Sequence, residues 1–201
     1  MQSNDLSGLY IRGHIKIYDP TTNEVIIDKA NAIHYENMSM ALADSIANRS
    51  NGWIDSMVFG NGGTTVDPTG IITYLTPNST GTNASLYNQT YTKVVNDNSS
   101  ANVDPTRNKI ETRHVTGKNY TDVFITCLLD YGEPSGQEAF DNVSNNDSNF
   151  VFDELGLMSY SPSGSTRLLT HVIFHPVQKS LNRLIQIDYT VRIQSLTGGA
   201  A

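Results

Sequence analysis

Two histidines, His171 and His175, stand four residues apart and could together bind a metal ion. On a helix, this spacing places both imidazoles on one face, as in many zinc sites. Here the histidines flank the apolar residues Val172-Ile-Phe, which indicate a strand. Four residues of strand span roughly 13 Å, too far for two ligands of one zinc ion. We therefore expect no shared metal at this pair.

A glutamate, Glu154, lies inside the apolar segment FDELGLMSYS. If extended, this segment has one face that carries the large side chains Phe150, Phe152, Met158 and Tyr160. Glu154 and Gly156 interrupt that face. A buried carboxylate must accept hydrogen bonds or meet a cation, and a strand glycine often marks a bulge or the close approach of another backbone. With no partner acid or base at a readable spacing, we interpret Glu154 as fixing a loop or subunit junction, while Gly156 makes room.

Other motifs that could support chemistry have simpler interpretations. The glycine run at 60–63 lacks the following helix and the Lys-Ser/Thr of a phosphate-binding loop, so it predicts a tight turn. The oxygen-rich stretch 141–149 lacks the glycine and glutamate of a calcium loop and predicts a solvated loop. Ser135 and Ser163 sit in Pro-Ser-Gly turns, not in a nucleophile elbow. Cys127 lies in an apolar strand and predicts a buried hydrophobe. We expect no enzyme, cofactor or metal.

Composition narrows the classes of partner. The chain has 201 residues, a charged fraction of 16% and a formal net charge of −7, with a pI near 5.0. This balance argues against binding to phosphate backbones, which needs clustered Lys and Arg. The N-terminus has no basic segment or apolar core, and no run of 18 apolar residues occurs, so we expect neither a signal peptide nor a membrane span. Without secretion, the many Asn-x-Ser/Thr sequences follow from composition alone.

The elements that must position these residues are mostly strands. Residues 9–19 and 25–28 alternate in polarity around a turn and predict a hairpin, whereas residues 35–48 have the helical period. Further strands are expected at 54–59, 86–95, 109–115, 122–131, 150–160 and 185–194. The pattern predicts a β-rich α+β fold, an antiparallel β-sandwich-like domain at 9–196 with a loop-rich insertion at 64–108. Segments 1–8 and 197–201 are expected to be flexible.

A resemblance to a known family is carried by two blocks of the chain. The blocks hold a strand that ends in Phe59-Gly-Asn-Gly-Gly, then Glu154-Leu-Gly-Leu, a turn at 161–165, Leu168-Leu-Thr, Phe174-His-Pro-Val-Gln-Lys and a closing alternating strand. This order resembles bacteriophage tail-associated structural proteins, notably the N-terminal virion-attachment domains of tail fibres. The resemblance covers about two thirds of the chain. It implies structural or interface roles for Glu154, Gly156, Leu157, Phe174, Pro176 and Lys179.

The resemblance implies a small virion component rather than a complete fibre, because a fibre would continue into a shaft and a tip. We expect a tail, neck, collar or baseplate protein, or an adaptor that docks a fibre, assembled in the host cytoplasm. Its partners would be other virion proteins and further copies of itself in a symmetric ring, without direct nucleic-acid or membrane contact. Two alternatives remain open: a carbohydrate-binding module that uses Tyr87 and Tyr91, and a capsid decoration protein.

Overall fold

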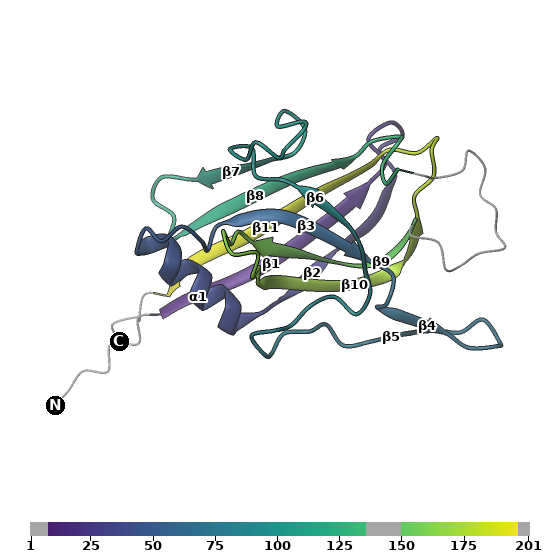
Figure 1. Ribbon diagram of the computed structural model, residues 1–201, viewed down its shortest axis with the longest axis horizontal. Helices are drawn as coiled ribbons and strands as arrows, with labels where there is room; N and C mark the ends of the chain where they lie inside the picture. Colours follow the sequence, from purple (N-terminus) through teal and green to yellow (C-terminus); the bar gives the residue numbers. More distant parts are fainter. Residues whose placement is uncertain (1–7, 136–149, 197–201) are drawn as a thin grey trace.

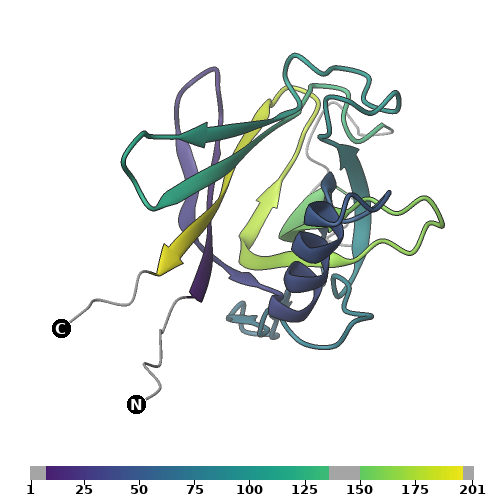
Figure 2. The same ribbon diagram turned by 90° about the vertical axis from the view of Figure 1, so that its left-hand side faces the viewer.

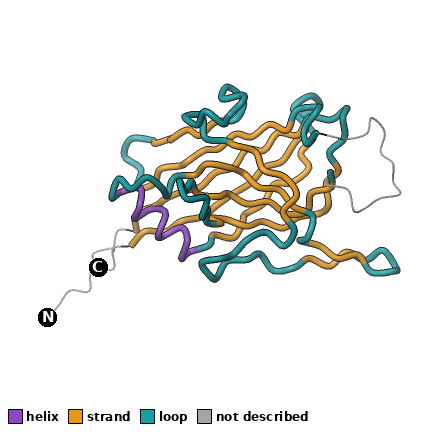
Figure 3. The backbone as a smooth tube through the Cα atoms, in the orientation of Figure 1, coloured by secondary structure: helices purple, strands orange, loops and turns teal. Residues whose placement is uncertain are grey.

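The computed structural model describes residues 8–135 and 150–196. Eleven strands and one helix are present in these residues (Figures 1 and 3). The elements in chain order are β1 (Gly8–Tyr18), β2 (Val25–Ile33), α1 (Tyr35–Ile46), β3 (Ile54–Gly60), β4 (Thr64–Val66), β5 (Ile72–Tyr74), β6 (Gln89–Val94), β7 (Lys109–His114), β8 (Tyr120–Leu129), β9 (Val151–Ser159), β10 (Leu168–Gln178) and β11 (Ile185–Leu196). The expectation of a β-rich α+β fold with one helix is confirmed.

Nine strands form one antiparallel sheet in the order β6-β3-β9-β10-β2-β1-β11-β8-β7. Strand β2 joins its two halves, because it pairs with β1 over Val25–Asn31 and then with β10 at Ala32 and Ile33. The sheet curls about this strand so that its halves face each other, as in a sandwich (Figure 2). Strands β4 and β5 form a separate hairpin that projects from the end opposite to α1 (Figure 1).

One hydrophobic core fills the space between the two halves. The β8 and β11 faces predicted to be apolar contribute to it, including Cys127, which is fully buried. Burial raises the pKa of the Cys127 thiol to about 12, so the thiol stays protonated and unreactive at neutral pH. A second, smaller cluster lies on the outer face of the other half, where Leu86 packs against Val58 and Leu168. Part of the predicted insertion therefore covers that outer face.

Helix α1 closes one end of the core. Its N-cap is His34, whose Nδ1 accepts a hydrogen bond from the Asn37 backbone N–H at 3.2 Å. Met38 and Ala41 are buried and pack into the core cluster. The helix ends at Ile46, two residues before the predicted boundary, and Asn48 then takes a left-handed conformation with φ of 53°. None of the helices among the described residues is long and apolar enough to cross a bilayer.

The predicted face of β9 needs correction. Phe152 lies in the main core with Leu155 and Leu157, whereas Met158 packs against the outer cluster. The cause is a register irregularity opposite residues 173–177 of β10, which changes the phase of the strand after Phe152. Glu154, Gly156 and Met158 thus share the outer side of the sheet, but Phe152 does not. Gly8, expected in the flexible arm, is the first residue of β1.

Candidate functional site

The carboxylate of Glu154 is fully buried and accepts four hydrogen bonds. Its Oε1 atom accepts from the backbone N–H groups of Asn88 at 2.8 Å and Gly62 at 3.1 Å. Its Oε2 atom accepts from the Tyr87 backbone N–H at 3.0 Å and lies 2.9 Å from His171 Nε2. Two loops on either side of the β4–β5 hairpin are thereby attached to the central strand β9.

The hydrogen bond at the second ring nitrogen of His171 shows which nitrogen carries the proton. His171 is also fully buried, and its Nδ1 accepts the backbone N–H of Asn78 at 2.8 Å. A nitrogen that accepts a hydrogen bond carries no proton, so the proton of the neutral ring lies on Nε2 and is donated to Glu154. The pair is therefore a neutral imidazole hydrogen-bonded to a carboxylate. Through its bond to Asn78, it attaches a third point of the chain between β3 and β6 to the sheet.

The preceding residue, Asp153, binds the same turn from the other side. Its Oδ1 accepts the Gly63 N–H at 2.9 Å, and its Oδ2 accepts both the backbone N–H, at 2.9 Å, and the hydroxyl of Thr64. Two adjacent carboxylates thus hold three successive backbone amides of the turn after β3. We call Asp153, Glu154, His171 and the backbone that they bind the Glu154 cluster.

The environment of Glu154 favours its ionised form. Burial is the largest influence and by itself would raise the pKa of this carboxyl. The hydrogen bonds from His171, Asn88, Tyr87 and Gly62 together outweigh burial and hold the pKa below its usual value. A carboxylate that stays charged, accepts four hydrogen bonds and does not reach solvent is suited to holding structure, not to exchanging protons with a substrate.

Glycines are required where the backbone approaches this cluster. A Cβ on Gly60 would lie 2.4 Å from the Asn88 carbonyl oxygen and 2.6 Å from Glu154 Oε1. A Cβ on Gly156 would lie 2.5 Å from the carbonyl oxygen of Thr170 on the neighbouring strand. The glycine run at 60–63 is thus a tight turn held by carboxylates, and Gly156 makes room for a second backbone, as its place in the sequence predicts.

The remaining candidate residues also lie in or near the interior. Leu157 and Phe174 are core residues, and Pro176 is half-buried at the irregularity in β10. Lys179 is only 1% exposed, and its Nζ donates to the Ser180 carbonyl oxygen at 3.0 Å. Desolvation lowers the pKa of Lys179 to about 8, against the opposing charges of Glu133 and Asp130. Leu157, Phe174 and Lys179 are thus buried within the chain, whereas Pro176 is partly accessible.

The structure also places the two histidines whose spacing resembles a metal-binding pair. His171 and His175 lie on one strand, β10; His171 bonds to Glu154, whereas His175 is exposed and lies 3.2 Å from the Tyr74 hydroxyl. Across residues 8–135 and 150–196, no group of three or more His, Cys, Asp or Glu side chains is arranged to hold a metal ion. The stretch 141–149 lies outside the described residues.

The aromatic pair weighed for glycan binding is divided between two environments. Tyr91 is half-buried and tilts against Phe59 of the core at a centroid distance of 6.0 Å. Burial is the main cause of the raised pKa of its hydroxyl. Tyr87 is exposed, and its hydroxyl donates to the Thr76 carbonyl oxygen at 2.7 Å. The two rings therefore do not form one sugar-binding platform.

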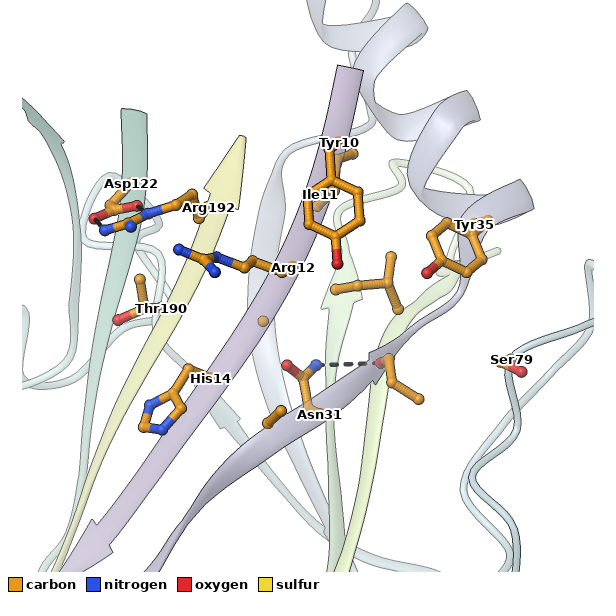
Figure 4. A pocket seen from close by; sticks show the side chains of 14 residues that line it. Tyr10, Ile11, Arg12, His14, Asn31, Tyr35, Ser79, Asp122, Thr190 and Arg192 are labelled. Atoms are coloured by element: carbon orange, nitrogen blue, oxygen red, sulfur yellow. Dashed lines mark hydrogen bonds and ion pairs between the residues drawn. The ribbon is translucent and has the colours of Figure 1, made fainter. Parts of the chain in front are cut away.

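A second region, which the sequence did not indicate, lies where β1 and β2 separate. A cleft of about 660 Å³ opens there, lined by Tyr10, Arg12, Asn31, Tyr35 and Arg192 among others. Figure 4 shows Arg12 extending over the outer face toward Arg192, while Tyr10 and Tyr35 lie on the side where β1 parts from β2 and α1 begins. We call this region the Arg12 cleft.

Of the two neighbouring arginines at the Arg12 cleft, only Arg192 is hydrogen-bonded to a carboxylate in the described part of the chain. Arg12 and Arg192 are direct cross-strand neighbours, and Arg192 lies opposite Asp122 on the next strand. Asp122 is engaged by Arg192 through two hydrogen bonds, at 2.6 and 2.7 Å, and these bonds are the main reason why its pKa is lowered. Arg192 also stacks on Tyr120, with its guanidinium carbon 3.7 Å from the ring centroid. Among the described residues, Arg12 makes no hydrogen bond and no ion pair within 4 Å, although its charge also contributes to the lowered pKa of Asp122.

An apolar groove of about 710 Å³ lies elsewhere, between α1 and the strands that flank the core. At this groove, Trp53 stacks on Tyr160 with a centroid distance of 4.8 Å and an interplanar angle of 9°. Asp55 stands among polar residues that also line it, and its pKa is raised by burial, against a hydrogen bond from Asn96. Two carboxylates, those of Asp55 and Asp97, and no histidine, lysine or cysteine are among the residues that line the groove.

Comparison of the chain with protein-family models, with curated proteins and with solved structures found no match. Function is therefore inferred from the geometry and from the resemblance of the sequence blocks.

Proposed function

We propose that the chain is a non-enzymatic structural component of a bacteriophage virion, in the tail, neck, collar or baseplate, or an adaptor that docks a fibre. It acts through protein–protein contacts in a symmetric oligomer. The Glu154 cluster carries this proposal. The two sequence blocks with the resemblance form the neighbouring strands β3, β9 and β10, and Glu154 of one block binds Gly62 at the end of the other.

The use of every polar atom in this cluster supports a structural role. The Glu154 carboxylate accepts four bonds, and both ring nitrogens of His171 are engaged. Neither group is exposed, so neither has capacity left for a substrate. The motif around Glu154 thus joins segments of the chain to one another. Function then lies in the exposed surfaces of the fold.

Exposed features supply such surfaces. Strands β6 and β7 are the two edges of the nine-stranded sheet. The β4–β5 hairpin projects into solvent and exposes Val66, Ile71 and Tyr74 at or beside its strands. Open edges and exposed apolar side chains are features that repeated subunits cover when they assemble.

Quantitative peptide mass spectrometry on gradient-purified phage particles tests the proposal, with the soluble fraction of the same lysate as the control. We expect the chain in intact particles at a fixed ratio to the major capsid protein and, after disruption of the particles, in the tail fraction. Recovery with the heads would instead indicate a capsid decoration protein. Recovery only in the soluble fraction would refute the virion role.

A further inference from the structure

The Arg12 cleft contains an open strand edge. Strand β1 pairs with β11 along its whole length, from Gly8 opposite Leu196 to Tyr18 opposite Gln186. Its pairing with β2 begins only at Gly13, opposite Asn31. Among the described residues, the segment 8–12 therefore has a strand partner on one side and none on the other. Five strand residues offer an edge about 17 Å long.

The cause of this open edge is the exchange of partners by β2. After Asn31 the strand leaves β1 and pairs with β10 through Ala32 and Ile33, and the chain then enters α1. In Figure 4, β1 and β2 diverge at this point, with Tyr10 and Tyr35 on the two sides of the opening. The cleft is thus part of how the two halves of the sheet are joined.

The side chains around the edge favour one kind of occupant. Leu9, Tyr10 and Tyr35 are 62%, 47% and 65% exposed, although large apolar side chains gain from being covered. Arg12 is exposed beside Arg192, whose charge is already balanced by Asp122. Like charges directly opposite each other on a sheet are destabilising, and a nearby carboxylate would relieve this.

We propose that the edge at 8–12 accepts an extended segment of a neighbouring protein by β-strand addition. On the added strand, an acidic residue faces Arg12 on the outer side, and the apolar residues one and three positions from it face Ile11 and Leu9 on the inner side. The alternation of strand side chains gives the pattern apolar–polar–apolar–acidic along the added strand. The identity of the neighbour as a virion protein rests on the proposed function, whereas strand acceptance does not.

A tethered peptide tests strand acceptance in the full chain. The sequence Thr-Val-Thr-Val-Glu is added after Ala201 through a flexible Gly-Ser linker, because Leu196 pairs with Gly8 and so lies at the start of the open edge. Tethering supplies millimolar effective concentration. Amide hydrogen exchange by NMR should slow at least about tenfold within residues 8–12 relative to the chain with the linker alone.

Charge-matched variants test the acidic residue. A tether with Gln in place of Glu, and the Arg12→Gln variant with the Glu tether, should each lose two- to fivefold of the protection, roughly the value of an exposed ion pair. Lys118→Gln removes one exposed positive charge away from the cleft and should lose none.

Two results would overturn the proposal. One is unchanged exchange at 8–12 with the Glu tether, and the other is protection that appears at β6 or β7 instead. Equal protection by the Glu and Gln tethers would overturn the acidic preference. Because none of these measurements uses particles, they can fail while the virion assignment stands, and the reverse also holds.

Discussion

The Glu154 cluster and the Arg12 cleft use similar side chains in opposite ways. In the cluster, two carboxylates and an imidazole are buried, and their hydrogen-bonding atoms are engaged by nearby backbone and side-chain groups. At the cleft, among the described residues, an exposed guanidinium makes no hydrogen bond or close ion pair, and an adjacent stretch of strand lacks a partner. The difference teaches that satisfied polar groups hold the fold together, while unsatisfied ones on the surface are available for further contacts.

The largest expected contrast is between two carboxylates. Glu154→Ala leaves three backbone N–H groups and the His171 ring without an acceptor, so we expect a loss of about 3–5 kcal/mol in the free energy of unfolding. Asp122→Ala breaks a more accessible ion pair and should cost about 1 kcal/mol. Urea denaturation of both variants measures the two values. Equal losses would remove the distinction between the two regions.

A smaller effect is expected for glycines of the two regions. Gly156→Ala places a Cβ against the Thr170 carbonyl oxygen and should cost about 1–3 kcal/mol through crowding, and valine more. Gly8→Ala, at the open edge, meets no atom within 4 Å and should change stability by less than about 0.5 kcal/mol. Thermal unfolding compares the variants. A tolerated Gly156→Ala would show that the two backbones have room to separate.

Lys179 gives a pH-dependent test of burial. Its pKa falls from 10.5 to about 8 on folding, so between these values the unfolded chain binds more protons at this residue than the folded chain does. The free energy of unfolding should therefore rise with pH across this window, relative to the Lys179→Met variant, which lacks the titration. Denaturation of both proteins from pH 7 to 9.5 measures the difference. Parallel profiles would mean that Lys179 is solvated.

The smallest effect is expected at Arg12. Arg12→Gln removes no observed hydrogen bond and relieves repulsion from Arg192, so stability should change by less than about 0.5 kcal/mol, if anything upward. Denaturation at low salt, where exposed charges are least screened, is the most sensitive measurement. A clear destabilisation would indicate that Arg12 supports the fold and is not free for a partner.

Much of the fold could be predicted because its signals are local. The alternation at 9–19 and 185–194 specifies strands whose faces the structure reproduces. The helical period at 35–48 specifies the helix but not its buried face, because Tyr35 and Ile46 of the predicted apolar side are exposed, whereas Asn37 and Ala41 are buried. The need of Glu154 for hydrogen bonds also followed from its place in an apolar strand.

Other features depend on residues far apart in the chain. The donors to Glu154 at 62, 87 and 88 lie 66 to 92 residues away and are brought there by tertiary packing. The phase change in β9 depends on an irregularity in its neighbour β10. The Arg12 cleft exists because β2 changes partners after Asn31, and no period within β2 itself signals this change.

Native-state hydrogen exchange of the free chain tests most directly whether the Glu154 cluster is structural. The amides of Gly62, Tyr87 and Asn88 lie outside the strands, yet each donates to a buried carboxylate. We predict that they exchange as slowly as the core amides of β9, through global unfolding. Exchange at the rate of exposed loops would contradict the account, because Glu154 would then not hold the segments that it contacts.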